Sequence, residues 1–287
     1  MKNRAKSPYL FYLIALPILA LTTVTLRTIA LLLGYEADIG RYANQTLSLI
    51  NGLLLLATVG ILAILAHEMK EMLAFKPNYR DLPTVFSGSF TAVTLLFFGI
   101  TLPLGTPTDN VYAMILAVFS GLMAIAGASL FVLRIFDSET RGGRFAILNL
   151  PLAVLGVSYP LYLTFGNHLR INDPAAIMAT VAWILIAFFF LGESRIALDR
   201  AKWALHTYVT VLAAIASATL SLPNIIYHIA QGEAILGNSE HDFVVLAIFL
   251  YTLARLFAIF RTIVHESTDT ARFAMGMEST SGDTDTK

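Results

Sequence analysis

The amino-acid sequence predicts an all-α integral membrane protein, a polytopic bundle of eight transmembrane spans. Of its 287 residues, 57% are hydrophobic and 13% are charged, with a mean hydropathy of +0.72. An ordinary soluble domain has about 25% charged residues, so two soluble domains are not expected from this chain. Eight apolar segments are long enough to span the bilayer, and Lys and Arg alternate between the connections that join them.

Each predicted span has about the 20 residues that a helix needs to cross about 30 Å of hydrocarbon. Helices are expected because lipid offers the backbone no hydrogen-bond partner. The eight spans are residues 9–33, 43–66, 84–104, 111–136, 145–165, 174–192, 203–227 and 243–264.

The first four spans differ in the residues that interrupt them. The first contains only Arg27 as a charge, and its apolar stretch is longer than the 7 to 15 residues of a signal-peptide core, which is the alternative interpretation. The second ends in His-Glu-Met-Lys-Glu at 67–71, where a zinc-protease helix would need histidine in place of Glu71. The third contains Pro103 near its end. The fourth has small residues at the spacing of a helix face, which we interpret as packing surface within the bundle: Ala113, Ala117, Gly121, Ala124 and Ala128.

The last four spans also contain helix breakers. Pro151 and Pro160 lie in the fifth span, and each removes a backbone hydrogen bond, so we expect a kinked helix with a cavity near Tyr159. The sixth span is followed by the polar residues 192–195, much as the second is followed by its own polar run. The seventh is rich in alanine and contains Pro223, and the eighth contains Arg255 near its middle and Arg261 near its end.

A weak internal repeat is the basis for predicting a parallel 4+4 duplication. Every odd-numbered span contains a Leu-Pro pair, and no even-numbered span does. Four spans return the chain to its starting side, so two such units would have the same orientation, with a substrate path expected between them. The spacings differ between the halves, and chance occurrence of Leu-Pro in an apolar chain is the alternative.

The connections predict the orientation of the bundle through the excess of Lys and Arg that cytoplasmic loops carry. The intervening connections together contain only two such residues, Arg41 and Arg170. Both termini are therefore expected in the cytoplasm, in a multi-pass protein of the cell membrane, with residues 267–287 as a disordered cytoplasmic tail. The basic connections contain Lys2, Arg4, Lys6, Lys70, Lys76, Arg80, Arg134, Arg141, Arg144, Arg195, Arg200, Lys202, Arg261, Arg272 and Lys287.

Two arginines, Arg27 and Arg255, lie within the spans and away from their basic ends, and no Asp or Glu lies in a span by these bounds. A charge near the bilayer centre costs about 2.5 to 3.5 kcal/mol, so each arginine should face the bundle interior. We expect it to bind a neutral polar group, a carbonyl freed by proline, water or an external anion such as carboxylate or phosphate. The alternative is that each side chain extends to the nearer interface, Arg255 toward Arg261.

Further polar residues gather at the external ends of the spans. Asn224 and His228 end the seventh span, His241 and Asp242 open the eighth, and Asn167, His168, Arg170 and Asp173 follow the fifth. Such a mouth suits a cation or a pH sensor, although loops in water carry these residues without any such role. The candidate substrate-binding residues are Arg255, Arg27, Tyr159, Asn224 and His228.

Several function classes are disfavoured. The chain has no cysteine, its net charge is zero, and it has no basic run, so thiolate sites and nucleic-acid partners are not expected. No nucleophile elbow, phosphate loop or paired intramembrane carboxylates are found, and we expect no enzyme, cofactor or metal site.

Two hypotheses of function remain. The first is a transporter or binding protein for a small anionic or lipid-linked substrate, which requires a polar cavity reached by Arg255. The alternative is a non-enzymatic membrane subunit or regulator that docks a partner protein through its helix faces. It predicts locally bound arginines and a small-residue face open to lipid. The expected partners are thus the lipid bilayer, an anionic molecule or lipid, and another membrane protein.

Overall fold

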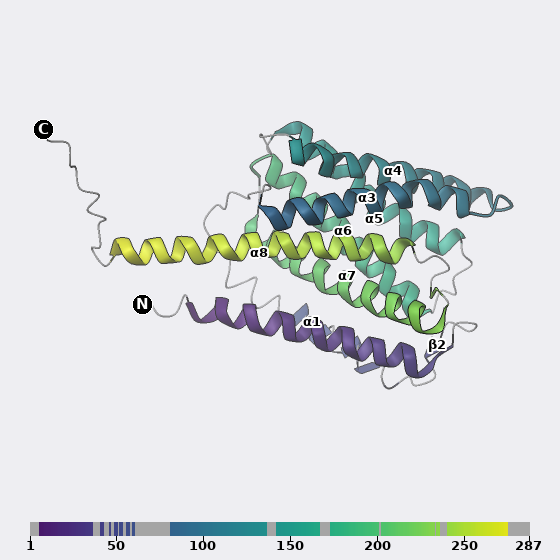
Figure 1. The fold of residues 1–287 in the computed structure, drawn as a ribbon, viewed down its shortest axis with the longest axis horizontal. Coiled ribbons are helices and arrows are strands. Elements are labelled where there is room, and N and C mark those ends of the chain that lie inside the picture. The colour runs from purple at the N-terminus through teal and green to yellow at the C-terminus, as the bar shows by residue number, and fades with distance from the viewer. Residues whose placement is uncertain are drawn as a thin grey trace, which may run out of the picture.

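Seven long apolar helices make up most of the computed structural model (Figure 1). It describes residues 6–36, 41–42, isolated positions from 46 to 60, 81–136, 142–166, 173–200, 202–232, 234–235 and 240–274. Each helix coincides with one predicted span, whereas most of the expected second span, 43–66, lies outside the described residues. The helices are α1 (Lys6–Gly34), α3 (Leu82–Gly105), α4 (Val111–Phe136), α5 (Gly143–Gly166), α6 (Pro174–Ala197), α7 (Trp203–Gln231) and α8 (Glu240–Ala274).

A short hairpin follows α1 and was not predicted. Strands β1 (Tyr35–Glu36) and β2 (Arg41–Tyr42) pair antiparallel, with Tyr35 opposite Tyr42. The Tyr35 ring contacts the ring of Tyr227 on α7 edge-on, with centroids 6.0 Å apart. The hairpin therefore joins the end of α1 to α7.

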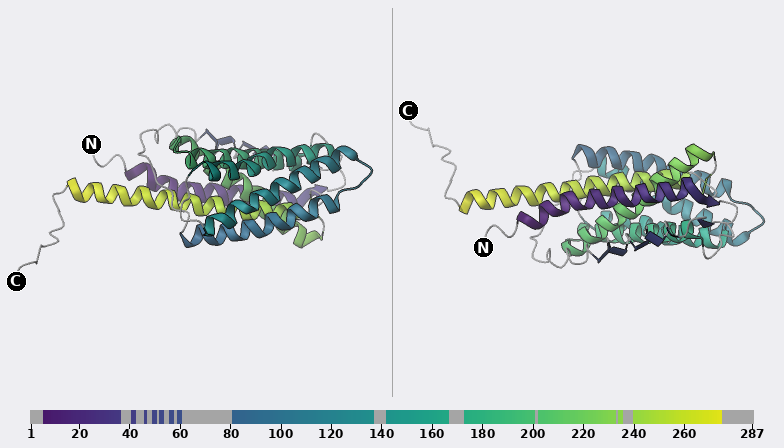
Figure 2. Two further views of the ribbon diagram at one scale, coloured as in Figure 1. Left: turned by 90° about the horizontal axis from the view of Figure 1, so that it is seen from above. Right: turned by 90° about the horizontal axis from the view of Figure 1, so that it is seen from below.

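Helices α3 to α8 form a closed ring in chain order. Each packs against the next, and α8 returns to pack against α3, while α1 lies outside the ring against α7 (Figure 1). Short connections favour this order because they make consecutive helices antiparallel neighbours. Helix α8 extends past the other helices (Figure 2) and continues to Ala274, beyond residue 267, where the tail was expected to begin.

Close contacts between α3 and α4 depend on glycine. A Cβ atom added at Gly121 would lie 2.6 Å from the carbonyl oxygen of Gly99, and one at Gly99 would lie 2.8 Å from that of Gly121. The other small residues on this face of α4 are buried as well, which confirms that the face packs within the bundle: Ala113, Ala117, Ala124 and Ala128.

Aromatic side chains fill the interior of the ring. Tyr159 packs against Trp183 and Phe98, with centroids 5.1 Å and 5.2 Å apart, and Phe131 packs against Tyr251 at 4.9 Å. These distances are typical of favourable aromatic pairs. All five rings are almost completely buried.

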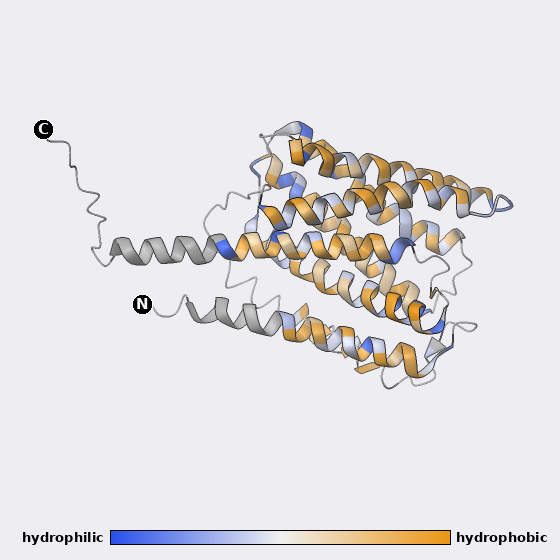
Figure 3. Cartoon of the chain, viewed as in Figure 1, coloured by the Kyte–Doolittle hydropathy of each residue, from blue (hydrophilic) through white to orange (hydrophobic). Residues whose placement is uncertain are grey.

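The outer surface is apolar along the length of the helices, with polar residues concentrated near their ends (Figure 3). Leu82, Phe86 and Phe136 are 81%, 75% and 79% exposed. So much exposed apolar surface is unfavourable in water and suits lipid. The seven helices and this surface are those of a multi-pass integral membrane protein. Eight spans, the orientation and the duplication stay predictions.

Candidate functional site

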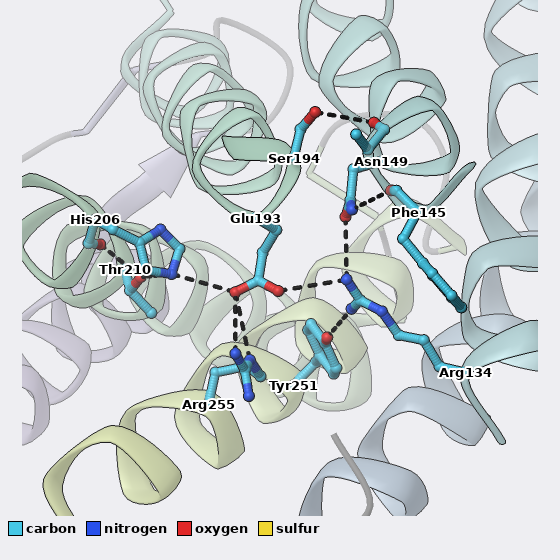
Figure 4. Close-up of polar contacts among 10 residues, drawn as sticks. Arg134, Phe145, Asn149, Glu193, Ser194, His206, Thr210, Tyr251 and Arg255 are labelled. Carbon is cyan, nitrogen blue, oxygen red and sulfur yellow. Dashed lines mark hydrogen bonds and ion pairs between the residues drawn. The ribbon is translucent and has the colours of Figure 1, made fainter. Parts of the chain in front are cut away.

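Four ionisable side chains meet inside one end of the ring, the end where α3, α5 and α7 begin and α4 and α6 finish. We call this the basic end. Glu193 of α6 is completely buried, and His206 Nε2 of α7 lies 3.2 Å from its Oε1. Arg255 Nε of α8 lies 3.4 Å from the same oxygen, and Arg134 Nη2 of α4 lies 3.4 Å from Oε2. Figure 4 shows Glu193 between Arg134 on one side and Arg255 and His206 on the other. These four residues are the basic-end cluster.

Neutral groups extend the cluster to α5. Arg134 donates a hydrogen bond from Nη1 to the Tyr251 hydroxyl oxygen and another from Nη2 to Asn149 Oδ1, 3.4 Å away. Asn149 in turn donates from Nδ2 to the Phe145 carbonyl oxygen at 2.7 Å. The cluster thus connects α4, α5, α6, α7 and α8 (Figure 4).

Gly192 makes room for one of these contacts. A Cβ atom at this position would collide with His206 Nδ1, so only glycine lets the imidazole of α7 lie so close to α6. The next residue is Glu193, which therefore comes within reach of His206 Nε2. The sequence Gly-Glu at the end of α6 is what places the imidazole beside the carboxylate.

Among its four residues, the basic-end cluster contains three basic side chains and one acidic side chain. Arginine remains protonated in proteins, so Arg134 and Arg255 contribute two permanent positive charges. Two guanidinium groups within 4 Å favour the charged form of Glu193, although burial opposes it. A single carboxylate then faces two guanidinium groups and the imidazole of His206.

The position of Glu193 corrects two predictions. The sixth span was predicted to end at residue 192, but α6 continues to Ala197, so a carboxylate does lie within a membrane helix. Arg255 thus pairs with a carboxylate of the chain itself, Glu193, which the expected partner types did not include. Hydropathy marks where a sequence becomes polar, whereas a helix continues as long as its backbone hydrogen bonds can form. Arg255 is also completely buried, so its side chain does not extend to the interface.

A small recess opens beside Arg134, and we call it the Arg134 recess. It has about 220 Å³ of space not filled by atoms, open solvent included. Helix α3 contributes Thr84, Val85 and Gly88 to its lining, α4 contributes Phe131, Arg134 and Ile135, and α8 contributes Tyr251. The Thr84 hydroxyl also donates to Asp81 Oδ2 at 3.0 Å, which places a carboxylate next to the recess.

A second polar group lies at the other end of the bundle, where α4, α6 and α8 begin. Arg27 of α1, 2% exposed, donates from Nη1 to the Thr219 carbonyl oxygen at 2.7 Å and from Nη2 to Asn224 Oδ1 at 3.0 Å. Asn224 donates from Nδ2 to Asp242 Oδ1 at 2.9 Å, and His241 Nε2 lies 3.1 Å from the same oxygen. We call these residues the opposite-end cluster.

The contact between Arg27 and Thr219 depends on Pro223 in α7. A proline has no N–H to donate to the carbonyl four residues before it, and here that carbonyl belongs to Thr219. Arg27 therefore binds a carbonyl freed by proline and the neutral amide of Asn224, two of the partner types expected from the sequence. Because the Arg27 side chain is buried, it does not extend to the membrane interface.

Four of the five predicted site residues lie toward the opposite end, and Arg255 does not. Tyr159 is buried with its ring centroid 5.9 Å from that of His241, and His228 occupies the last turn of α7. Arg255 belongs to the basic-end cluster, which includes His206 of α7, while Arg27 binds near Thr219 of the same helix. At about 1.5 Å per residue the two positions on α7 are roughly 20 Å apart.

Asp173 begins α6 at the same end of the bundle. Its Oδ1 accepts a hydrogen bond from the Ala175 backbone N–H at 2.8 Å, and the Tyr35 hydroxyl donates to it at 3.4 Å. Burial raises the pKa of the Asp173 carboxyl, and these two hydrogen bonds oppose that rise. Burial likewise raises the pKa of Tyr35, so the hydroxyl keeps its proton and remains a donor. Asn167, His168 and Arg170 lie outside the described residues.

Arg134, Glu193 and His206 are the main residues that the sequence analysis did not select. Arg134 was counted among the basic connections, Glu193 was placed beyond a span, and His206 was not proposed as a site residue. The only signal was that all three occur near span ends on the same predicted side. A scan against protein-family models and searches of curated proteins and of solved structures gave no match.

Proposed function

We propose that this membrane protein binds an anionic group, phosphate or carboxylate, in the Arg134 recess. The observation that carries the proposal is that the guanidinium of Arg134 lines the recess, where the other lining residues are neutral. A planar guanidinium has five N–H donors and suits such oxyanions. The sequence led us to expect the anion at Arg27 and Arg255. The proposal places it instead at Arg134, which contacts the same carboxylate, Glu193, as Arg255.

The depth of the recess indicates how a ligand would reach it. Arg134 lies two residues before the end of α4 at Phe136, and Thr84 lies in the first turn of α3. At about 1.5 Å per residue, Arg134 is about 3 Å from the end of its helix. That is the level of lipid headgroups, so a lipid phosphate or a dissolved anion can enter without crossing hydrocarbon.

Transport and partner docking are not part of this proposal. Aromatic side chains, among them Tyr159 and Trp183, fill the ring between the two polar clusters, where a transporter would need a polar path. The small residues of α4 pack against other helices within the bundle, so they offer no docking face. Binding at the basic end is the function that the described side chains support best.

The test compares binding of two probes, inorganic phosphate and short-chain phosphatidylglycerol, to the purified protein in detergent. Arg134→Gln should weaken binding of the tighter probe about tenfold or more, because a charge-assisted bond contributes about 1.5 to 3 kcal/mol. The matched control Arg27→Gln removes the buried arginine at the other end and should change affinity by less than about twofold.

A second variant guards against misfolding. Thr84→Leu places a larger apolar side chain in the lining of the recess without removing any charge, and it should also abolish binding. Unchanged affinity in both Arg134→Gln and Thr84→Leu, with the thermal unfolding of each retained, would show that the recess is not the site.

A further inference from the structure

We infer that the ligand of the Arg134 recess is an aminophospholipid, whose phosphate binds Arg134 and whose primary ammonium binds Asp81. This inference rests on the proposed function and adds the chemical class of the ligand. It follows from the position of Asp81, whose carboxylate lies beside a recess lined by the cationic side chain of Arg134.

Asp81 occupies the N-cap of α3 without making a cap hydrogen bond from its side chain. An aspartate at this position usually accepts a hydrogen bond from the N–H of the second or third helical residue. Here the second helical residue is Pro83, which has no N–H to donate. Proline therefore removes one of the donors that an N-cap carboxylate would otherwise bind.

One oxygen of Asp81 lacks a donor among the described residues. Its Oδ2 accepts from the Thr84 hydroxyl at 3.0 Å, whereas Oδ1 is buried and has no hydrogen-bond partner in the part of the chain that the structure describes. A buried acceptor without a donor is unfavourable, and a primary ammonium brings three N–H donors.

Thr84 connects Asp81, which does not itself line the recess, to the recess beside Arg134. It hydrogen-bonds Asp81 and lines the recess together with Arg134 and Tyr251. Asp81 is also close enough to the Tyr251 hydroxyl to interact with it electrostatically, and that hydroxyl accepts a hydrogen bond from Arg134. A carboxylate and a guanidinium thus lie near the same recess, one on α3 and one on α4.

This pairing favours a zwitterion over a simple anion. Asp81 would repel a headgroup that carries only negative charge, and Arg134 would repel one that carries only positive charge. A headgroup with a phosphate and an ammonium places each charge beside its opposite. Ethanolamine satisfies this description, whereas choline has no N–H to donate to Asp81 and glycerol has no positive charge.

The surface around the recess suits a lipid more than a free headgroup. Leu82 and Phe86 on α3 and Phe136 on α4 point outward near the recess, and all three are at least 75% exposed. Acyl chains lying on these side chains would add apolar contact that a water-soluble headgroup lacks. The ligand is therefore expected to enter from the lipid around the bundle.

The test measures retention of three lipids with identical acyl chains by the full-length protein, using native mass spectrometry. The lipids are phosphatidylethanolamine, phosphatidylcholine and phosphatidylglycerol. The unmodified protein should prefer the ethanolamine lipid over each of the others about tenfold, a difference expected for one charge-assisted hydrogen bond. Asp81→Asn should remove this preference and still retain the glycerol lipid. The matched control Asp109→Asn changes an exposed acid in the connection between α3 and α4, at the opposite end of the bundle, and should keep the preference.

The outcomes separate the inference from the proposed function. If the unmodified protein retains the glycerol lipid as well as the ethanolamine lipid, or if Asp81→Asn keeps the preference, the aminophospholipid assignment is overturned, while a loss in Arg134→Gln still supports anion binding. If Arg134→Gln retains all three lipids undiminished, both fail. If free phosphoethanolamine competes on equal terms with the lipid, the ligand is the soluble headgroup and the lipid class is overturned.

A second variant covers the case in which Asp81→Asn fails to fold. Pro83→Ala supplies an N–H at the second helical position, where it can donate to Asp81 and compete with the ammonium. It leaves both charged side chains in place. It should lower the preference for the ethanolamine lipid, and an undiminished preference would contradict the assignment.

Discussion

At the scale of single residues, Arg27 donates a hydrogen bond to a backbone carbonyl that Pro223 leaves without a helical donor. Pro223 leaves the Thr219 carbonyl without its helical N–H, and Arg27 donates to that carbonyl from another helix. A buried carbonyl without a donor and a buried guanidinium without an acceptor are both unfavourable. The hydrogen bond between the Arg27 guanidinium and the Thr219 carbonyl satisfies both groups and attaches α1 to α7.

This account predicts that Arg27→Lys and Pro223→Ala are coupled. A lysine has no planar fork with which to bind the Thr219 carbonyl and Asn224 together, so Arg27→Lys should lower the unfolding free energy by about 1 to 3 kcal/mol. With Pro223→Ala present, the new N–H can bind Thr219, and the same change should be less destabilising. A double-mutant cycle followed by thermal unfolding in detergent measures the coupling, and additive effects would argue against the shared carbonyl.

Asp173 predicts a dependence of stability on pH. Because burial raises its pKa above the ordinary value of 3.8, the folded protein holds this proton more tightly than the unfolded chain does. The protonated Asp173 carboxyl therefore makes its full contribution to the free energy of unfolding below pH 3.8. That contribution is lost as the pH rises through the folded-state pKa. Asp173→Asn keeps an acceptor for Ala175 and cannot ionise, so its unfolding temperature should fall less over that range. An equal fall in both proteins would contradict this assignment.

At the scale of helices, close packing depends on a few glycines that face a neighbouring backbone. The mutual approach of Gly99 and Gly121 lets α3 and α4 lie closer than any residue with a Cβ atom would allow. Lipid provides little hydrophobic drive for helices to associate, so such close contacts supply much of the attraction between them.

Gly121→Ala should therefore destabilise the bundle, because its Cβ atom would meet backbone that cannot move aside. We expect a loss of about 1 to 3 kcal/mol, the usual range for overpacking. Gly105→Ala is the matched control, since nothing lies within 4 Å of its added Cβ atom. Thermal unfolding of the two variants in one detergent gives the comparison, and equal unfolding temperatures would mean that α3 and α4 do not pack in this way.

The positions of seven helices could be predicted from the sequence, because hydropathy governs what enters the membrane, although α8 continues ten residues beyond the predicted end at residue 264. The end of α6 could not, since its last turn is polar yet still helical, and this concealed Glu193. The prediction that a proline-freed carbonyl serves as an arginine partner is confirmed at Arg27. Contacts such as Arg134 with Glu193 join distant parts of the chain, and no local pattern encodes them.

At the scale of the whole molecule, polar clusters at the two ends of the ring enclose an aromatic interior. Helix α8 packs against α3, and α1 lies outside the ring against α7. Neither contact could be predicted from hydropathy, because each joins helices that are far apart in the sequence. The arrangement puts the Arg134 recess at one end of the helices, near lipid headgroups. The account thus depends on the basic end lying at one membrane surface and the opposite end at the other.

Cysteine accessibility in sealed vesicles tests this claim most directly, because the chain has no cysteine of its own and single-cysteine variants are unambiguous. Thr108→Cys lies in the exposed connection between α3 and α4 at the opposite end, and Gly143→Cys begins α5 at the basic end. A membrane-impermeant thiol reagent should label one of them only from outside and the other only after the vesicles are opened. Labelling of both from the same side of intact vesicles would contradict the layout and the proposed headgroup site with it.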